Sequence, residues 1–181
     1  TALSIARAFA ARNVDVDFRA TGQTGIMISG GGIPMDAVVS DFAAGAAEML
    51  SPEADPDHWD VMEGQGSLLH PAYAGVSLAL LHGSQPDVFV VCHDPSRKCL
   101  LGDEEFPVPS LDDIIELTIA LGGRSSGAIR CGGISLNTST HDETAAVDLC
   151  LSESARLGLP VADPIRGGPT FDQLVDECLK P

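Results

Sequence analysis

The sequence has little positive charge. Its 181 residues include 10 lysines and arginines but 26 aspartates and glutamates, which gives a net charge of −16 at pH 7. Lysine occurs only at Lys98 and Lys180. An acidic surface repels the phosphates of nucleic acids and of anionic membranes. We therefore expect no nucleic-acid partner and no membrane partner. The expected partners are small-molecule substrates, and the protein is expected to form a homo-oligomer.

Long apolar runs and paired cysteine motifs are also missing. No run of about 18 apolar residues could form a membrane-spanning helix, and no charged leader of the signal-peptide type precedes an apolar run. The five cysteines lack C-x-x-C spacing, and Cys92, Cys131 and Cys150 lie in apolar stretches. This pattern predicts reduced, mostly buried thiols in a cytoplasmic protein, without a disulfide framework or a metal site.

A phosphate-loop motif is absent as well. The chain contains no G-x-x-x-x-G-K-[ST] string, and it opens on a helical pattern with no strand before it. The triple glycine at 30–32 has no lysine after it and reads as a flexible loop. In a phosphate-binding α/β domain, strand, glycine-rich loop and helix form the first unit. We therefore expect the first strand and the phosphate loop to be missing from this chain.

What the sequence does have is a repeat of strand, polar loop and helix. Short runs rich in β-branched residues end in polar residues or glycine, and a helical pattern follows each. This order is typical of a parallel sheet with right-handed crossovers. It predicts a single α/β domain over residues 1–181, with a parallel sheet flanked by helices on both faces. The expected strands are 16–20, 59–62, 87–92, 128–136 and 160–162.

Helices are expected where apolar residues recur at helical spacing. Ser110, the pair Thr140 and Glu143, and the pair Thr170 and Gln173 are the expected N-terminal caps. Segments 51–58 and 98–109, rich in proline and acidic residues, are expected to be exposed, mobile loops. The expected helices are Thr1–Arg12, Asp36–Leu50, Pro71–His82, Leu111–Leu121, Ala145–Leu157 with Gly158 as C-cap, and a last helix ending near Leu179.

Polar strings follow the strands at the end where open parallel sheets bind their ligands. Glu63 comes directly after the strand Trp59–Met62, and the glycines beside it let backbone N–H groups approach a ligand closely. Arg97 follows another strand end and is one of few cations in an acidic chain. The strings are Thr21–Gly25, Glu63–Gly66, His93–Arg97 and Asn137–Thr140.

Each of these residues also has a structural interpretation. Glu63 could orient a metal or a water instead of acting as a base, and Asp94 could cap a turn before Pro95. His70 could cap the helix that starts near Pro71. Asp36 is read as a helix cap after Pro34, and Tyr73 as a core residue beside His70.

Five strings occur in order along the chain and together point to one family. They closely resemble the D-glutamate N-acetyltransferase (DgcN-like) family over nearly the whole length, from Thr1 to about Leu179. The strings are Ala20–Ile26, Asp36–Val38 with Asp41–Phe42, Glu63–Tyr73, His93–Arg97 and Gly133–Asn137.

The resemblance implies a P-loop NTPase-like domain similar to dethiobiotin synthetase. Members carry a phosphate loop just before the first helix of this chain and an N-terminal Rossmann-like domain, so the chain is expected to be a C-terminal fragment of a two-domain parent. The implied activity is transfer of acetyl from acetyl-CoA to the amino group of D-glutamate or a related amino acid. An ATP-dependent ligase or kinase, with Glu63 holding Mg²⁺, and a non-catalytic fragment remain alternatives.

Aminolysis of a thioester needs a general base, donors for an oxyanion and cations for carboxylates or phosphates. The implied catalytic residues are Glu63, Asp94 and His70. The implied binding residues for substrate or acetyl-CoA are Thr21, Gly22, Gln23, Thr24, Gly25, Gly64, Gln65, Gly66, Ser96, Arg97 and Asn137.

Overall fold

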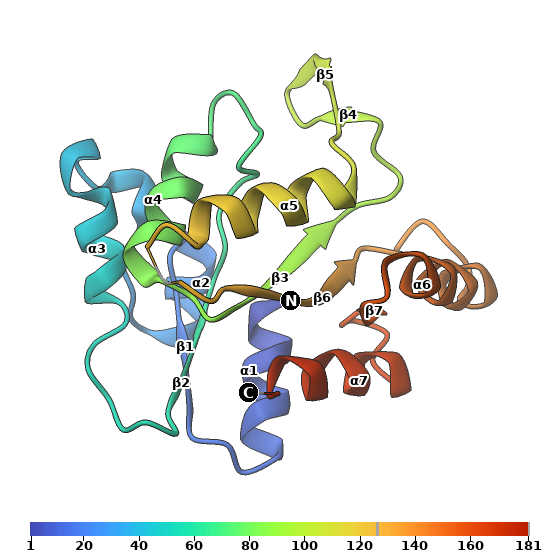
Figure 1. The fold of residues 1–181 in the computed structure, drawn as a ribbon, viewed down its shortest axis with the longest axis horizontal. Coiled ribbons are helices and arrows are strands. Elements are labelled where there is room, and N and C mark those ends of the chain that lie inside the picture. Colours follow the sequence, from blue (N-terminus) through green and yellow to red (C-terminus); the bar gives the residue numbers. More distant parts are fainter. Residues whose placement is uncertain (126, 181) are drawn as a thin grey trace. The chain divides into compact units, whose positions relative to one another are not determined.

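The computed structural model describes residues 1–125 and 127–180, which form two compact units (Figure 1). The first, called here the N-terminal unit, contains Ala2–Pro86 and Ala120–Gly127. The second, the C-terminal unit, contains Thr1, Asp87–Ile119 and Ala128–Pro181. The expectation of a single domain stays a prediction.

The N-terminal unit is built on a parallel pair of strands, β1 and β2, whose register runs from Val16 opposite Trp59 to Arg19 opposite Met62 (Figure 1). Helix α1 packs on both strands, and its buried Phe9 meets the ring of Trp59 edge-on at 5.3 Å. The elements are α1 (Ala2–Ala11), β1 (Val16–Arg19), α2 (Gln23–Ser29), η1 (Met35–Ala37), η2 (Ser40–Phe42), α3 (Ala43–Met49), β2 (Trp59–Met62) and α4 (Ala74–Ser84).

Helices α3 and α4 approach each other closely because small residues line their contact. Ala47 of α3 is fully buried, and Leu80 of α4 packs into the same cluster with Met35. A Cβ placed on Gly83 would overlap the backbone oxygen of Ala44 and lie 2.8 Å from the Cβ of Ala47. Only glycine fits there at this helix separation.

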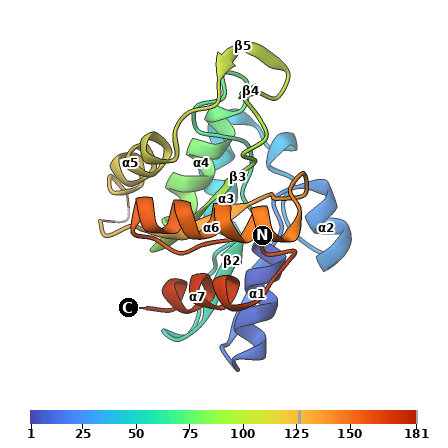
Figure 2. The same ribbon diagram turned by 90° about the vertical axis from the view of Figure 1, so that its right-hand side faces the viewer.

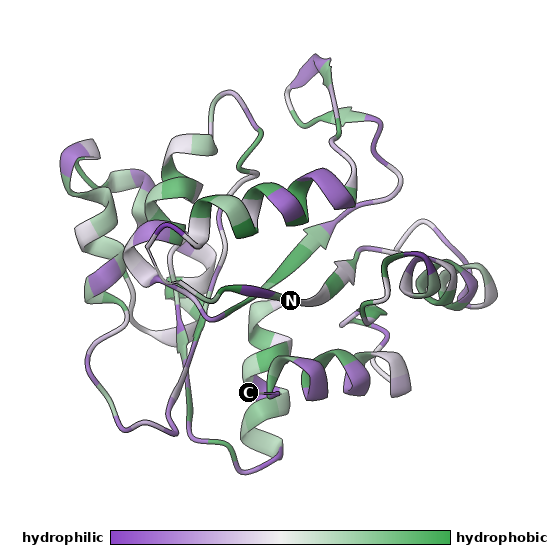
Figure 3. Ribbon diagram, viewed as in Figure 1, coloured by the Kyte–Doolittle hydropathy of each residue, from purple (hydrophilic) through white to green (hydrophobic). Residues whose placement is uncertain are grey.

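The C-terminal unit holds the three-stranded parallel sheet β3-β6-β7, with β6 in the middle. Strand β3 is hydrophobic along most of its length (Figure 3). Both α6 and α7 contact β7. Figure 2 shows α6 lying above α7. The elements are β3 (Val88–His93), β4 (Cys99–Leu100), β5 (Asp103–Pro107), α5 (Leu111–Gly122, whose last three residues belong to the N-terminal unit), β6 (Arg130–Leu136), α6 (Glu143–Leu157), β7 (Val161–Ala162) and α7 (Pro169–Cys178).

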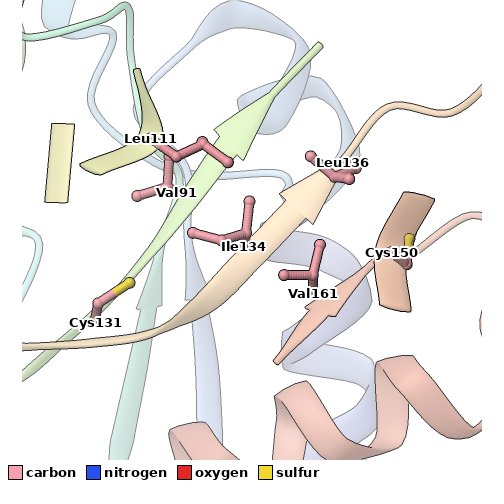
Figure 4. Packing of buried hydrophobic residues seen from close by; sticks show 7 residues of the cluster. All are labelled: Val91, Leu111, Cys131, Ile134, Leu136, Cys150 and Val161. Carbon is pink, nitrogen blue, oxygen red and sulfur yellow. The ribbon is translucent and has the colours of Figure 1, made fainter. Parts of the chain in front are cut away.

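The core of the C-terminal unit centres on β6. Ile134 is fully buried and Leu136 nearly so, and both lie between side chains of the neighbouring strands and helices (Figure 4). Burying such side chains stabilises the fold by about 1.5–3 kcal/mol each. The cluster is Val91, Leu111, Cys131, Ile134, Leu136, Cys150 and Val161.

Two glycines let β6 pass close to its neighbours. The β3–β6 register shifts so that Gly132 is an extra residue on β6. Gly133 has φ +147°, and a Cβ there would lie 2.6 Å from the oxygen of Pro160.

Strand β6 begins at Arg130, whose guanidinium donates to the carbonyls of Glu177 and Cys178 at 3.1 Å each. Arg130 therefore caps the C-terminal end of α7.

The α/β class predicted from the sequence is confirmed: the β1-β2 and β3-β6-β7 sheets are parallel, whereas the short β4-β5 pair is antiparallel. Every expected strand lies within two residues of an observed one. The Ser110 cap is also correct, since its hydroxyl accepts from the N–H of Asp113 at 3.1 Å. Gly158 ends α6 in the left-handed conformation, as expected. Among the described residues, no helix has the length and apolarity needed to cross a bilayer.

The expected helix Asp36–Leu50 is confirmed only over Ala43–Met49. Val38 and Val39 are extended, with ψ of 141° and 131°, so two short 3₁₀ turns precede a helix that begins only at Ala43. β-branched residues lose side-chain freedom in helices, which favours this break. Conversely, α2 begins at Gln23, inside the string expected to be a polar loop.

Several boundaries also differ from expectation. Helix α4 begins at Ala74, after a turn at Pro71. The cap of α6 is Asp142, which accepts from the N–H of Ala145, so Thr140 lies outside. Thr170 lies inside α7, which begins at Pro169, a residue that suits a first helical position.

Two further expectations need correction. Segment 98–109 is not wholly irregular, because β4 and β5 pair as an antiparallel hairpin whose turn contains Gly102 at φ +81°. Cys92 is exposed, whereas Cys131, Cys150 and Cys178 are buried free thiols. Cys92 alternates with buried Val91 along β3, and successive strand residues face opposite sides.

The contact at Gly83 predicts opposite effects for two glycines of α4. Gly83→Ala should lower the free energy of unfolding by about 1–3 kcal/mol, because the methyl group overpacks against the α3 backbone. Gly75→Ala is the matched control: nothing lies within 4 Å of its Cβ position, so alanine should raise stability by up to about 1 kcal/mol. Urea unfolding of both variants measures this, and equal effects would contradict the close α3–α4 contact.

Candidate functional site

The loops after β1 and β2 are joined through Glu63. Its N–H continues the ladder by donating to the oxygen of Arg19 at 2.9 Å. Its carboxylate Oε2 then accepts from the N–H groups of Thr21 and Gly22, both at 2.9 Å. The Thr21 hydroxyl donates to the oxygen of Glu63 at 2.8 Å and accepts from Gln65 Nε2 at 2.7 Å. Besides the ladder bond, four hydrogen bonds thus hold the two loops together, and Thr21 is fully buried among them.

Gly25 makes room for this carboxylate. A Cβ at Gly25 would overlap Oε2 of Glu63 and lie 2.8 Å from its Cδ. Gly22 is the N-cap of α2, so Glu63 satisfies the N–H of the N-cap residue, which has no intrahelical partner, and the N–H of Thr21 just before it. Local chemistry explains the position: an acid after β2 meets the open donors of the helix that follows β1.

An open pocket lies beside Glu63, with a volume of about 390 Å³. Asp36 reaches it from η1, and Tyr73 and Val76 reach it from the start of α4. The pocket is called here the Glu63 pocket. It is lined by Gly22, Gln23, Thr24, Asp36, Glu63, Gln65, Gly66, Tyr73 and Val76.

His70 is buried at the turn that leads into α4. Its Nδ1 accepts from the N–H of Ala72 at 3.1 Å, and its ring lies 4.4 Å from that of Tyr73, centroid to centroid. Its carbonyl accepts from the N–H groups of Tyr73 and Ala74. His70 therefore organises the chain where α4 begins, and it is not among the residues lining the Glu63 pocket.

Asp94, Ser96, Arg97 and Asn137 lie together in the C-terminal unit. Asp94 Oδ1 accepts from Ser96 through its hydroxyl at 2.6 Å and its N–H at 3.1 Å. Asp94 Oδ2 receives Arg97 Nε at 3.2 Å and Asn137 Nδ2 at 3.5 Å. The hydrogen bond from the Ser96 hydroxyl is the largest cause of a lowered pKa of Asp94. The Ser96 N–H and the nearby Arg97 charge also lower this pKa, whereas partial desolvation opposes the shift. A carboxylate held ionised in this way is a weak base.

The predicted site residues thus form one group in each unit. Thr21–Gly25 and Glu63–Gly66 come together in the N-terminal unit, although the exposed Gly64 is not among the lining residues. The strand-end rule accounts for both groups, because Glu63 and Asp94 each follow a parallel strand directly.

Sequence reasoning missed three positions. Asp36 and Tyr73 line the pocket, whereas the sequence predicts a helix cap at Asp36 and a core residue at Tyr73. Asp163 is buried after β7 and binds the N–H and hydroxyl of Thr138 at 3.0 and 2.5 Å. Burial opposes ionisation of Asp163, yet the Thr138 hydroxyl and nearby N–H groups lower its pKa overall. The strand-end rule would have found Asp163, since it follows Val161–Ala162 directly.

A cluster on β1 and β2 has the spacing of a metal site. The ligand atoms of Asp17, His58 and Asp60 all lie within 4.8 Å of one another. Arg19 already bridges the two aspartates, at 2.9 Å from Asp17 and 2.5 Å from Asp60. Asp17 and Asp60 are direct cross-strand partners, so a guanidinium stands where a cation would neutralise them.

Comparison with known proteins identifies the family. Residues 1–175 match the model of one family, DUF1611, which is described as a domain of unknown function and as a P-loop domain. The chain belongs to the DUF1611 family. A DUF1611 family protein from Anabaena variabilis, known from a 2.30 Å crystal structure, superposes with a TM-score of 0.90 at 36% identity. The match covers 98% of this chain and 52% of that one.

Two curated relatives carry a functional name. A D-glutamate N-acetyltransferase from Pseudoalteromonas is 49% identical over 168 residues, which are 93% of this chain and 51% of that protein. A D-glutamate N-acetyltransferase from Tritonibacter scottomollicae is 46% identical over the same share of this chain and 50% of its own length. The DUF1611 chain thus spans about half the length of the curated relatives it matches. The family resemblance and the P-loop type of domain expected from the sequence are confirmed.

The fit of Glu63 against Gly25 predicts that a methyl group at residue 25 destabilises the loops. Gly25→Ala should drive the carboxylate away and leave the N–H groups of Thr21 and Gly22 without their partner, at a cost of about 1–3 kcal/mol. Gly64→Ala is the control for stability, since nothing lies within 4 Å of its Cβ position. Thermal unfolding measures both, and a Gly25→Ala variant as stable as the wild type would mean that Glu63 is not held in this way.

The His58 cluster predicts a pH-dependent stability. The hydrogen bond to Asp15 at 2.9 Å raises the pKa of His58 above 6.5, although burial opposes the rise, and Asp60 adds to it. A histidine with a raised folded-state pKa stabilises the fold fully below pH 6.5 and loses that effect as pH rises through the folded value. The stability difference between wild type and His58→Gln should therefore shrink above pH 6.5.

Asp15→Asn provides the control for this pH effect, because it removes the carboxylate whose hydrogen bond contributes most to the raised pKa of His58. The stabilisation by His58 should then disappear at lower pH than in the wild type. Urea unfolding between pH 5 and pH 8.5 would follow both, and a difference independent of pH would contradict the ion-pair account.

Proposed function

We propose that this DUF1611 chain forms part of an amino-acid N-acetyltransferase, which transfers acetyl from acetyl-CoA to the amino group of D-glutamate or a related amino acid. The observation that carries the proposal is the 46–49% identity, over 93% of the chain, with two proteins named D-glutamate N-acetyltransferase. The Glu63 pocket supports it, because a carboxylate fixed beside neutral hydrogen-bonding groups suits the deprotonation of an amine.

Glu63 is assigned as the general base. Among the described residues, both hydrogen bonds of its carboxylate go to Oε2, which leaves Oε1 to receive a proton. The substrate ammonium passes a proton to Glu63, and the free amine attacks the thioester carbonyl. The new C–N bond forms, the C–S bond breaks, and the CoA thiolate leaves and takes up the second proton, which the attacking nitrogen loses as the amide forms. Asp94 is less suited to this task because its pKa is lowered.

The other residues are assigned by what they contact. Gln23 and Thr24 line the pocket and orient the acceptor, while Thr21 and Gly25 position Glu63. The N–H of Gly66 is the proposed donor to the oxyanion, because Gly66 lines the pocket and its carbonyl is fixed by Ser77 Oγ at 2.5 Å.

Gly64 and Gln65 shape the same loop, and Gln65 ties it to Thr21. His70 is assigned a positioning role, because its buried Nδ1 is engaged by Ala72.

In the C-terminal unit, Arg97 is the proposed cation for a substrate carboxylate or a CoA phosphate. Its side chain is 48% exposed and contacts Asp94 through Nε, which leaves the terminal nitrogens of the guanidinium to pair with an anion. Ser96 and Asn137 hold Asp94 in place and thereby orient Arg97.

An ATP-dependent ligase or kinase is the second candidate, favoured by the description of the family as a P-loop domain. One feature of the Glu63 pocket opposes binding of nucleotide phosphates there: its charged lining residues, Asp36 and Glu63, are both acidic.

The complete gene product, assayed for release of the CoA thiol from acetyl-CoA, tests the proposal. Thiol release should depend on D-glutamate or a related amino acid and should not require ATP. Glu63→Gln keeps an oxygen that can accept the two N–H bonds but removes the base, so turnover should fall about 10²–10⁴-fold. The control is Glu48→Gln, an exposed acid on α3 outside the pocket, which should leave turnover unchanged.

Three results would count against this assignment. ATP-dependent phosphate release without acetyl transfer would favour the ligase or kinase. Acetyl transfer with near-wild-type turnover in Glu63→Gln would remove Glu63 as the base. No thiol release with any D- or L-amino acid would overturn the acetyltransferase proposal itself.

A further inference from the structure

We propose that Asp36 binds the positively charged amino group of the acceptor, and that the Glu63 pocket is an ammonium subsite that excludes carboxylates and phosphates. The inference rests on the proposed function for the identity of the amine. It adds the end of the substrate that the pocket accepts and the residue that selects it.

The charge of the pocket lining carries the first step. Asp36 and Glu63 are its charged members, and the other polar lining residues are neutral amides or hydroxyls. The cations of the N-terminal unit, Arg7, Arg12, Arg19 and Arg124, are not among the lining residues. A pocket with two carboxylates and no cation attracts an ammonium group and repels an anion.

The backbone around Asp36 fixes it at the pocket. Met35 is buried, with 2% of its surface exposed, and its N–H donates to the oxygen of Thr21 at 2.9 Å. Ile33 donates to the oxygen of Ala20 at 3.1 Å. Both bonds tie η1 to the loop that also holds Glu63, so Asp36 and Glu63 are positioned by the same segment.

Asp36 also differs from the other acids near the strand ends. Asp17 and Asp60 pair with Arg19, and Asp94 pairs with Arg97. Within residues 1–125 and 127–180, no lysine or arginine forms an ion pair with Asp36. Its charge is therefore left for a ligand cation.

In this arrangement the two carboxylates have different roles in binding and in proton transfer. Asp36 and Glu63 both accept N–H bonds from the ammonium group, and Glu63 then takes the proton. The carboxylates of the acceptor must point out of the pocket, because two like charges inside would repel them. Asp36 should consequently govern affinity for the amine, and Glu63 the rate of transfer.

Calorimetric titration of the complete gene product tests the subsite with three probes. D-glutamate carries the amine and two carboxylates, glutarate has the same carbon chain without the amine, and n-propylamine carries the amine alone. D-glutamate and n-propylamine should bind, and glutarate should bind at least about 10-fold more weakly than D-glutamate. Asp36→Asn should weaken binding of both amines about 10–100-fold, the effect of losing one hydrogen bond to a charged group.

Two variants serve as controls. Asp41→Asn removes the neighbouring acid of η2, which does not line the pocket, and should leave all three affinities unchanged. Asp36→Glu keeps the charge and should restore at least part of the affinity that Asp36→Asn loses. In the thiol-release assay, Asp36→Asn should raise KM by the same factor while kcat changes less than about threefold. Thermal unfolding checks that each variant is folded.

The outcomes separate this inference from the proposed function. Amine binding that depends on Asp36, without acetyl transfer to any amino acid, would overturn the acetyltransferase proposal and leave the ammonium subsite standing. Acetyl transfer with an unchanged KM in Asp36→Asn would overturn the subsite and leave the proposed function. Failure of both D-glutamate and n-propylamine to bind the wild type, or glutarate binding as well as D-glutamate, would also overturn the subsite.

Discussion

The carboxylate of Glu63 and the two backbone N–H groups of Thr21 and Gly22 form the contact on which the N-terminal unit depends most. This contact joins the ends of β1 and β2, and Thr21 completes it by donating back to the backbone of Glu63. Position 25 accommodates only glycine, because the Glu63 carboxylate fills the space that a Cβ would need. The loop so fixed also holds η1 through Thr21, which places Asp36 at the same pocket. One structural hydrogen-bond set thereby positions the two acids of the pocket.

The distribution of charge fits this picture. In a chain with net charge −16, the arginines on or beside strands are engaged within their own units: Arg19 with two aspartates, Arg130 with carbonyls at the end of α7, and Arg166 with Thr138 and Glu143. Arg97 has nearly half of its side chain exposed. The lining of the Glu63 pocket includes two acids and no lysine or arginine, so the proposed acceptor would present its positively charged amine to this pocket.

The sequence predicted those parts of the fold that follow from local periodicity. Strands were recognised from β-branched runs, and the strand-end rule led directly to Glu63 and Asp94. The sequence could not reveal that the N–H groups of Thr21 and Gly22 hold the Glu63 carboxylate, because that contact joins residues about 40 positions apart in the chain. Asp36 was missed for a related reason: the apolar spacing of Val38, Val39 and Phe42 suits a helix, but η1 is tied to the β1 loop and the valines become extended. Tertiary hydrogen bonds outweighed local propensity there.

A crystal structure of the complete gene product with D-glutamate and CoA bound would test the central claim most directly. That claim is that Glu63 and Asp36, fixed by one loop, receive the amine of the acceptor. The account predicts the amino nitrogen within hydrogen-bond distance, about 2.7–3.2 Å, of carboxylate oxygens of both Asp36 and Glu63, with the substrate carboxylates outside the pocket. A carboxylate or a CoA phosphate bound in the Glu63 pocket, with the amine elsewhere, would contradict it.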